Sequence, residues 1–302
     1  MKEIVVVSGK GGTGKTSLVA SLAVLARPCV LADCDVDAAD LHLVMKPEIR
    51  EREDFIGGRK AEIMPDKCVE CGKCYEVCRF GAIVREEEKH PAYAIDPVSC
   101  EGCGVCRYFC PEKAVRFEPA VEGQWFVSAT RYGLMVHARL GMGGENSGKL
   151  VSLVRASARK IAEREHVPYI IVDGPPGIGC PVIASVTGAD AVLMVTEPTV
   201  SGEHDLERVA DLAGHFTIPV YLCVNKFDLN PDLGRSMEKE ARSQGITLVG
   251  RVHYDPAMTR AQMKGEPVML SEDTVAAKDI REVWKNLVSN MPVDNQNHGK
   301  ED

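Results

Sequence analysis

The chain has 302 residues, a formal net charge of −8 and 45% hydrophobic residues, a composition typical of a soluble globular protein with about two domains. The acidic balance argues against general binding to nucleic acid or to anionic membranes. No stretch approaches the ~18 consecutive apolar residues of a membrane span. Because the first residues already enter a predicted strand, we expect no signal peptide and a cytoplasmic location.

The first predicted elements are a strand, a glycine-rich turn and a helix. Residues 4–7 form a β-branched apolar run, and residues 17–26 have apolar side chains at helical spacing. The turn reads S-G-K-G-G-T-G-K-T over residues 8–16 and fits the phosphate-loop pattern G-x-x-x-x-G-K-[ST]. Its backbone N–H groups and the helix dipole favour bound phosphate. The expected nucleotide-binding residues are Gly11, Gly12, Thr13, Gly14, Lys15, Thr16 and Ser17, with Lys15 on the β- and γ-phosphates and Thr16 on Mg²⁺.

A second predicted strand, residues 29–32, ends in a run of acidic residues. Asp33 and Asp35 come directly after it, and Asp37 and Asp40 follow in what we expect to be a loop and a helix start. The carboxyl ends of parallel strands are where open α/β sheets bind ligands. We therefore expect Asp33 and Asp35 near the phosphate loop, with Asp33 near Mg²⁺.

Residues 48–66 are polar and charged, with Gly57-Gly58 as an expected turn, and they lead into a predicted insert at residues 64–118. The insert carries two runs spaced C-x2-C-x2-C-x3-C, the pattern of bacterial two-cluster ferredoxins. Three cysteines of one run and the fourth of the other are expected to hold each [4Fe–4S] cluster. The first set is Cys68, Cys71, Cys74 and Cys110, and the second is Cys78, Cys100, Cys103 and Cys106.

Two features qualify this interpretation of the insert. Four-thiolate zinc sites are the alternative for any C-x2-C pair, and Arg79 stands where ferredoxins usually have proline after the fourth cysteine. The module also has few apolar residues between its cysteines. We therefore expect a small α+β ferredoxin-like module in which bound clusters supply much of the folding free energy.

The remaining chain alternates strands with helices. Strands are predicted at residues 114–117, 125–129, 169–173, 191–196, 220–224 and 246–252, and helices at 150–164, 203–213 and 275–289. Residues 130–149 are glycine-rich and fit either a mobile contact loop or a long connection. The last residues, 292–302, are polar and predicted to be disordered. The strand at 220–224 leads into Asn225-Lys226-Phe227-Asp228, which matches the guanine-reading pattern of GTPases, so GTP is an alternative to ATP.

A second lysine near the start of the phosphate loop, Lys10 in K-G-G-T-G-K-T, narrows the family. This loop resembles the deviant phosphate loop of the MinD/ParA/Mrp/nitrogenase-iron-protein superfamily of ATPases. The resemblance implies ATP or ADP with Mg²⁺, and an α/β domain with helices on both faces of a mostly parallel sheet. That discontinuous domain would comprise residues 1–63 and 119–291. The resemblance also implies a homodimer with ATP sandwiched at its interface, where Lys10 contacts the partner's nucleotide.

The same resemblance assigns roles to other residues. Asp35 would orient the attacking water, and Asp173 would bind the Mg²⁺ shell. The turn after Asp173 resembles the second switch region, made of Gly174, Pro175, Pro176 and Gly177. Asn225 would contact adenine, which favours ATP over GTP, and Pro256 would flank the base. MinD proteins end in a basic amphipathic membrane-binding helix, and nothing at this C-terminus is similar to it, so no membrane anchor is expected.

Three functions are compatible with these features. The leading hypothesis is an ATP-dependent redox switch that hydrolyses ATP slowly without its redox or regulatory protein partner. The second is a ParA/MinD-like positioning or scaffolding ATPase in which the clusters are structural or sense redox state. The third is an iron–sulfur cluster carrier, weakened because no C-x2-C motif lies outside the insert. The isolated Cys29, Cys34, Cys180 and Cys223 are interpreted as structural.

Overall fold

A nine-stranded sheet forms the centre of the protein, in the order β11-β10-β9-β1-β8-β2-β7-β6-β3. The computed structural model describes residues 1–86, 90–141, 146–271 and 273–292. The strands from β11 to β7 are parallel, whereas β6 is antiparallel to both β7 and β3. The strands are β1 (Lys2–Ser8), β2 (Cys29–Asp33), β3 (Glu48–Ile63), β6 (Val115–Ala129), β7 (Leu134–Leu140), β8 (Tyr169–Pro176), β9 (Ala191–Thr196), β10 (Val220–Asn225) and β11 (Thr247–Val252).

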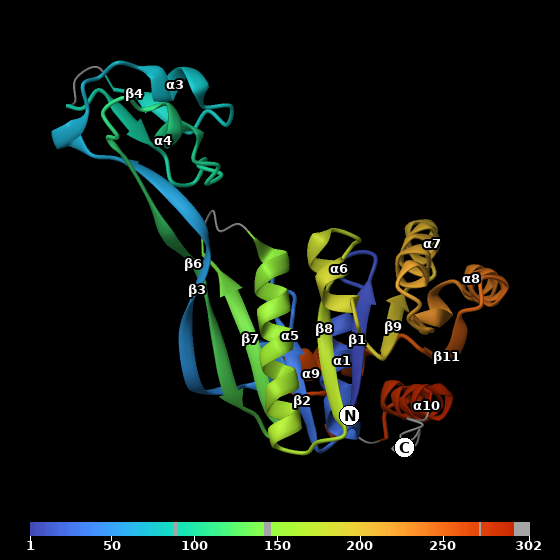
Figure 1. The fold of residues 1–302 in the computed structure, drawn as a ribbon. Coiled ribbons are helices and arrows are strands. Elements are labelled where there is room, and N and C mark those ends of the chain that lie inside the picture. Colours follow the sequence, from blue (N-terminus) through green and yellow to red (C-terminus); the bar gives the residue numbers. More distant parts are fainter. Residues whose placement is uncertain (87–89, 142–145, 272, 293–302) are drawn as a thin grey trace, which may run out of the picture.

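Helices cover both faces of the sheet because the inner strands are apolar on both sides (Figure 1). In β1, Ile4 and Val6 face one core and Val5 and Val7 face the other. Helices α1 (Lys15–Leu25), α2 (Leu41–Met45), α9 (Pro256–Lys264) and α10 (Val275–Asn290) pack on the first core. Helices α5 (Ser147–Arg164), α6 (Cys180–Val186), α7 (Val200–His215) and α8 (Pro231–Ser243) pack on the second. The expected fold class of the main domain is confirmed. None of the helices that the structure describes is both long enough and apolar enough to cross a membrane.

The strands β3 and β6 form a long antiparallel ribbon that leaves the sheet and carries the cysteine-rich segment at its far end (Figure 1). Their pairing runs from Glu48 opposite Ala129 to Ile63 opposite Val115. The segment beyond it contains η1 (Pro65–Lys67), α3 (Lys73–Val77), β4 (Ile83–Arg85), β5 (Tyr93–Ile95) and α4 (Val105–Phe109). We call residues 64–114 the cysteine module and the rest of the described chain, without the ribbon, the body.

The ribbon corrects two expectations from the sequence. The predicted turn at Gly57-Gly58 is wrong, because both glycines lie within β3 where its register with β6 shifts. A Cβ atom on Gly57 would lie 1.8 Å from Glu122 Oε2, so the Glu122 carboxylate occupies the space beside this glycine. The strands predicted at 114–117 and 125–129 are parts of the single strand β6.

The glycine-rich segment at 130–149 also differs from both of its interpretations. Residues 134–140 form β7, which pairs with β2 and β6 inside the sheet. Val136 is fully buried and His137 is 9% exposed, so this part is core rather than loop. Residues 142–145 lie outside the described residues, as does nearly all of the tail predicted to be disordered.

Candidate functional site

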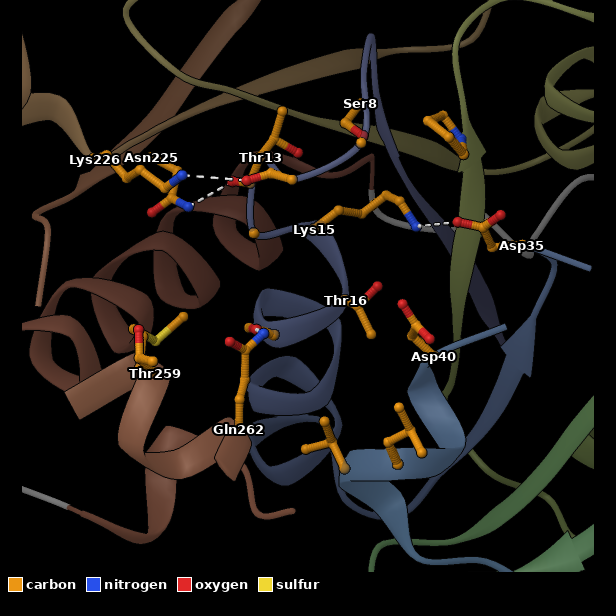
Figure 2. A pocket seen from close by; sticks show the side chains of 18 of the residues that line it. Ser8, Thr13, Lys15, Thr16, Asp35, Asp40, Asn225, Lys226, Thr259 and Gln262 are labelled. Carbon is orange, nitrogen blue, oxygen red and sulfur yellow. Dashed lines mark hydrogen bonds and ion pairs between the residues drawn. The ribbon is translucent and has the colours of Figure 1, made fainter. Parts of the chain in front are cut away.

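The phosphate loop joins β1 to α1 and borders a cavity of about 620 Å³ (Figure 2). Gly12 and Gly14 have φ angles of 83° and 86°, in the left-handed region that favours glycine. Gly14 directly precedes α1, so the loop N–H groups lie at the start of this helix. Among the residues predicted to bind nucleotide, Mg²⁺ or water, the cavity is lined by Gly11, Gly12, Thr13, Gly14, Lys15, Thr16, Ser17, Asp35, Pro176 and Asn225.

Lys15 lies among three carboxylates at the carboxyl ends of neighbouring strands. It forms an ion pair with Asp173 at the end of β8, and its Nζ lies 3.6 Å from Asp35 Oδ2. Asp33 pairs in register with Asp173 across β2 and β8. Burial alone would lower the Lys15 pKa, but the charges of Asp173, Asp35 and Asp33 outweigh it and raise that pKa. The topology of the sheet therefore gathers the acids that the sequence predicted.

The negative charges of Asp33, Asp35 and Asp173 are not fully balanced by Lys15. Burial raises the pKa of Asp33 well above its usual value, and the charge of Asp173 raises it further. Burial also raises the pKa of Asp35, against the opposing effect of Lys15. The buried atoms Asp33 Oδ2 and Asp173 Oδ2 have no hydrogen-bond partner among the described residues. Asp33 and Asp173 lie behind the cavity and do not line it, whereas Thr16 and Asp35 do. Carboxylate oxygens without partners, together with the Thr16 hydroxyl, are the kind of oxygen ligands that Mg²⁺ prefers.

The predicted second switch region follows Asp173 directly. Gly174 and Pro175 are buried, and β8 continues to Pro176. A Cβ atom on Gly174 would lie 2.8 Å from Val6 O, which explains glycine at this position. The N–H of Gly177 donates to Ser8 O at 2.9 Å. This turn is therefore hydrogen-bonded to the beginning of the phosphate loop.

The opposite side of the cavity contains the predicted base-contacting residues. Asn225 Nδ2 donates to Thr13 O at 2.7 Å (Figure 2). Pro256 begins α9 but is not among the cavity-lining residues, whereas its neighbours Tyr254 and Asp255 are. The Asp228 carboxylate accepts a hydrogen bond from Tyr254 N at 2.6 Å. Because Asp228 holds this loop and does not line the cavity, the N-K-x-D match does not form a guanine-reading site here.

Lys10 points to a different set of residues from Lys15. Its Nζ lies 3.0 Å from Glu197 Oε1 and 3.0 Å from Ser201 Oγ, and it is not among the cavity-lining residues. Glu197 also binds Lys226, whose Nζ is 3.0 Å from Oε2. Sequence reasoning missed the roles of Glu197 and Lys226. The only signals were the position of Glu197 after a buried strand and that of Lys226 within the N-K-x-D pattern.

Sequence reasoning also missed part of the cavity wall opposite the phosphate loop. Met258, Thr259 and Gln262 come from one face of α9, and His253 precedes this helix. Asp40, expected only to start a helix, lines the cavity as well (Figure 2). The spacing i, i+1, i+4 of the three α9 residues is a helical face, but no motif distinguishes a ligand-facing side from a solvent-facing one.

The eight cysteines of the insert line two separate cavities in the cysteine module. Cys68, Cys71, Cys74 and Cys110 line a cavity of about 20 Å³. Cys78, Cys100, Cys103 and Cys106 line another of about 20 Å³. Each cavity thus contains three cysteines of one run and the last cysteine of the other, which is the grouping expected from the spacing.

The thiols are not arranged around a single point. Across the described ranges, no group of three or more His, Cys, Asp and Glu side chains is arranged to hold one ion. A [4Fe–4S] cluster differs because each thiolate binds a separate iron, so the sulfurs surround a core instead of meeting at one point. Burial, with a smaller contribution from the charges of Cys100 and Cys103, raises the pKa of Cys106 to about 11. Four thiols around one cavity fit such a cluster better than a single zinc ion.

Comparison with known proteins agrees with the nucleotide site. The family described as CobQ/CobB/MinD/ParA nucleotide binding domain matches residues 4–268. An uncharacterized protein of Methanocaldococcus jannaschii is 34% identical over 232 residues, which cover 76% of this chain and 79% of that protein. An iron-sulfur cluster carrier protein of Pyrococcus horikoshii is 29% identical over 147 residues, 44% of this chain and 49% of the carrier.

Among solved structures, the septum site-determining protein MinD of Pyrococcus horikoshii, complexed with Mg-ADP, has the same fold. It superposes with a TM-score of 0.58 at 15% identity, covering 96% of this chain and 97% of that one. The family match extends over most of the chain, including the phosphate loop, Asp35, Asp173 and Asn225. The chain therefore belongs to the CobQ/CobB/MinD/ParA family of nucleotide-binding proteins.

Proposed function

We propose that the protein is a Mg²⁺-dependent, homodimeric ATP switch that couples its nucleotide state to two [4Fe–4S] clusters. The observation that carries this proposal is the separation of the eight module cysteines into two sets, each lining its own cavity. The module stands on a ribbon that continues the same sheet from which the phosphate loop emerges. Nucleotide site and cysteine sets are thus parts of one hydrogen-bonded framework.

The contacts of Lys15 support the nucleotide half of the switch. When ATP and Mg²⁺ bind, the Lys15 ammonium moves from Asp173 to the phosphates, and Mg²⁺ supplies the positive charge that the acids then need. Asp173 and Asp33 would face the Mg²⁺ shell, and Asp35 would orient the attacking water. Gly177, hydrogen-bonded to Ser8, lies where a turn that responds to the γ-phosphate would be required.

The position of Lys10 supports a dimer. Its side chain is 36% exposed, and its ammonium lies outside the cavity of its own chain. Leaving Glu197 would allow the ammonium to contact a nucleotide held by a second copy. The two chains would then enclose ATP between their phosphate loops.

The chemistry of the donor set supports the cluster half. Four thiolates per cavity match the ligand number of a [4Fe–4S] cluster, and bound clusters would let the module accept and donate single electrons. The chain itself contributes a close fit around each set. The Ala114 N–H donates to Cys110 Sγ at 3.2 Å, and Gly72 and Gly104 have positive φ angles at the starts of α3 and α4.

A second candidate function is favoured by one comparison. The similarity to the iron-sulfur cluster carrier protein covers less than half of each chain, yet it suggests cluster transfer. Outside the module, Cys29, Cys34 and Cys223 are buried and Cys180 is exposed, so the described part of one chain presents a single exposed cysteine there, and a shared site would need Cys180 from both copies. A carrier would release its clusters to an apo-protein, whereas a redox switch would keep them through many turnovers.

The test uses anaerobically purified full-length protein. Iron and sulfide content are measured first, and the reduction potentials are then followed by EPR without nucleotide, with ADP and with a non-hydrolysable ATP analogue. A nucleotide-dependent shift of ~60 mV, about 1.4 kcal/mol per electron, is the expected sign of coupling. Lys15→Gln is the matched control, since it should keep both clusters but lose the shift.

Two results would overturn the proposal in different ways. Zinc in place of about eight irons would exclude the clusters. Bound clusters with potentials that ignore nucleotide would leave a positioning ATPase whose clusters are structural or sense redox state. Size-exclusion chromatography with light scattering, with and without the ATP analogue, tests the dimer separately.

A further inference from the structure

One lysine of the ribbon reaches the second cysteine set. Lys60 lies on β3 next to Ala61, which lines the cavity of that set. Its Nζ donates to Cys100 O at 2.6 Å, and the side chain is half-buried. Cys100 itself is 8% exposed. The positive charge of Lys60 is therefore held at the backbone carbonyl of Cys100. In the proposed function, the thiol of this same residue is a cluster ligand.

The backbone around this contact is closely packed. A Cβ atom on Gly102 would lie 2.3 Å from Arg59 O, so the strand and the loop that begins at Cys100 touch along their main chains. Gly102 has a φ of 63°, which lets the loop turn away directly after the contact. The Lys60 ammonium is consequently fixed relative to Cys100 instead of moving freely in solvent.

The two cavities differ in this respect. Each is lined by one acidic residue, Glu112 in the first and Glu101 in the second, and by no lysine or arginine within the described chain. The first set receives a backbone N–H from Ala114 on Cys110 Sγ. The second set has the side-chain cation of Lys60 on the carbonyl of Cys100. Each cavity thus has one acidic lining residue, and the lysine contact belongs to the second set. A further carboxylate, Asp96, lies near Lys60: hydrogen bonds from Ser99 and Val98, and then the Lys60 charge, lower its pKa.

We infer that Lys60 tunes the reduction potential of the cluster held by Cys78, Cys100, Cys103 and Cys106, keeping it more positive than it would be without this charge. The inference rests on the proposed clusters. Adding an electron makes a cluster more negative, so a fixed cation nearby stabilises the reduced form. Because the lysine is half-buried, salt screens this interaction less than it screens an exposed pair.

The experiment compares Lys60→Gln, Lys60→Arg and Arg50→Gln in the full-length, cluster-loaded protein. Arg50 is the matched control, because it is an exposed cation on the same strand paired with Glu48. It lies roughly 33 Å from Lys60 along the strand at ~3.3 Å per residue, far beyond the ~8 Å Debye length. Potentials are measured by EPR-monitored titration, and a Cys71→Ala variant, altered only in the first cluster, assigns the two signals.

The expected result is a more negative potential for the second cluster in Lys60→Gln, with a smaller change for the first. Lys60→Arg keeps the charge and should restore most of the wild-type value, and Arg50→Gln should change neither cluster. An unchanged second potential in Lys60→Gln with full iron content would overturn the inference. Equal shifts of both clusters would also overturn it, since they indicate a rearrangement of the whole module.

If Lys60→Gln loses iron, Lys60→Met is measured as a second variant, because methionine keeps an apolar stem like that of lysine but has no charge. If Met retains iron, its potential replaces that of Gln in the comparison. If both lose iron while Arg retains it, Lys60 anchors the Cys100 loop and the tuning role is overturned. Failure of the proposed function is distinct, because wild-type protein would then contain no [4Fe–4S] signals at all.

Discussion

The body and the cysteine module are held together in different ways. The body has two extended hydrophobic cores, one on each face of the sheet. The cluster of buried residues at the module is small and consists of Ala61, Ile63, Ala82, Cys100 and Val115. Tyr108, by contrast, is 84% exposed. The difference teaches that burial of apolar surface stabilises the body, whereas in the proposed function the module would depend on the clusters that its cysteines bind.

Removing one module cysteine gives the largest expected effect. In Cys103→Ala, the second cluster should be lost and the chain around its cavity should open, because little apolar surface remains to order it, while the first cluster stays bound. Hydrogen exchange should show unprotected amides over residues 78–83 and 100–106, while ATP affinity of the body stays within about twofold. Cys180→Ala, which removes an exposed cysteine of the body, should leave module protection unchanged. A module that stays protected without iron would contradict the comparison.

The second prediction concerns a substitution in the hydrophobic core of the body. Leu22 is fully buried in the core on the α1 face, and Leu22→Ala should cost about 2–5 kcal/mol of unfolding free energy through lost contacts and the cavity left behind. Chemical denaturation followed by far-UV circular dichroism measures this loss. Iron content at temperatures below the transition should equal that of the wild type. Simultaneous loss of iron and body structure would show that the two regions unfold as one unit.

Lys15→Gln sharpens the comparison at the nucleotide site. Loss of the ammonium that reaches the phosphates should weaken ATP binding by roughly 100-fold, about 2.7 kcal/mol. Titration with a fluorescent ATP analogue measures the change, and Lys239→Gln, on the exposed side of α8, is the control that should bind normally. If Lys15→Gln bound ATP as the wild type does, the cavity at the phosphate loop would not be the nucleotide site.

Asp33→Asn should give the smallest effect, and its sign depends on ligand and pH. The pKa of Asp33 is raised in the folded protein by burial and by Asp173, so the folded state binds a proton more tightly than the unfolded chain does. Its contribution to stability is therefore present at low pH and is lost as the pH rises from the ordinary Asp value through the folded one.

The amide should accordingly raise the melting temperature of the ligand-free protein at neutral pH by roughly 2–4 °C, about 1 kcal/mol. This gain should shrink as the pH falls toward the ordinary Asp range, where the wild-type carboxyl is itself neutral. The same variant should bind Mg-ATP more weakly. Thermal scans across pH without Mg²⁺ or nucleotide provide the measurement. A lower melting temperature at neutral pH would mean that the Asp33 charge stabilises the fold.

The sequence predicted the local parts of the molecule well. The phosphate loop is defined by adjacent residues, and the strand, turn and helix around it were expected from apolar spacing alone. The acids Asp33 and Asp173 are far apart in the chain. The rule that ligands bind at the carboxyl ends of parallel strands predicted the place of Asp33, and the family resemblance assigned Asp173 to the same site. The two cysteine sets were likewise separable from spacing, because the cavities group them as expected.

Features that depend on distant contacts were not predictable. Gly57 looks like a turn residue until Glu122 of the opposite strand is placed beside it. His137 interrupts the apolar pattern of β7, and its partner Ser128, 2.9 Å away, becomes visible only when β6 lies alongside. Glu197 joins Lys10 to Lys226 across segments that no local pattern relates. In each case the role of a residue depends on a side chain that is distant in the sequence and that only the fold brings into contact with it.

The ribbon of β3 and β6 sets the distance between the body and any partner that binds to the module. Residues 56–63 of β3 lie beyond the part of β6 that pairs with β7, and at ~3.3 Å each they give a span of roughly 26 Å. A disordered linker would allow the module many positions relative to the body. A hydrogen-bonded pair of strands restricts it to one direction and one distance. In a two-fold assembly the two modules would then be kept at a fixed separation. The length of the ribbon would therefore limit the size of a partner that fits between them.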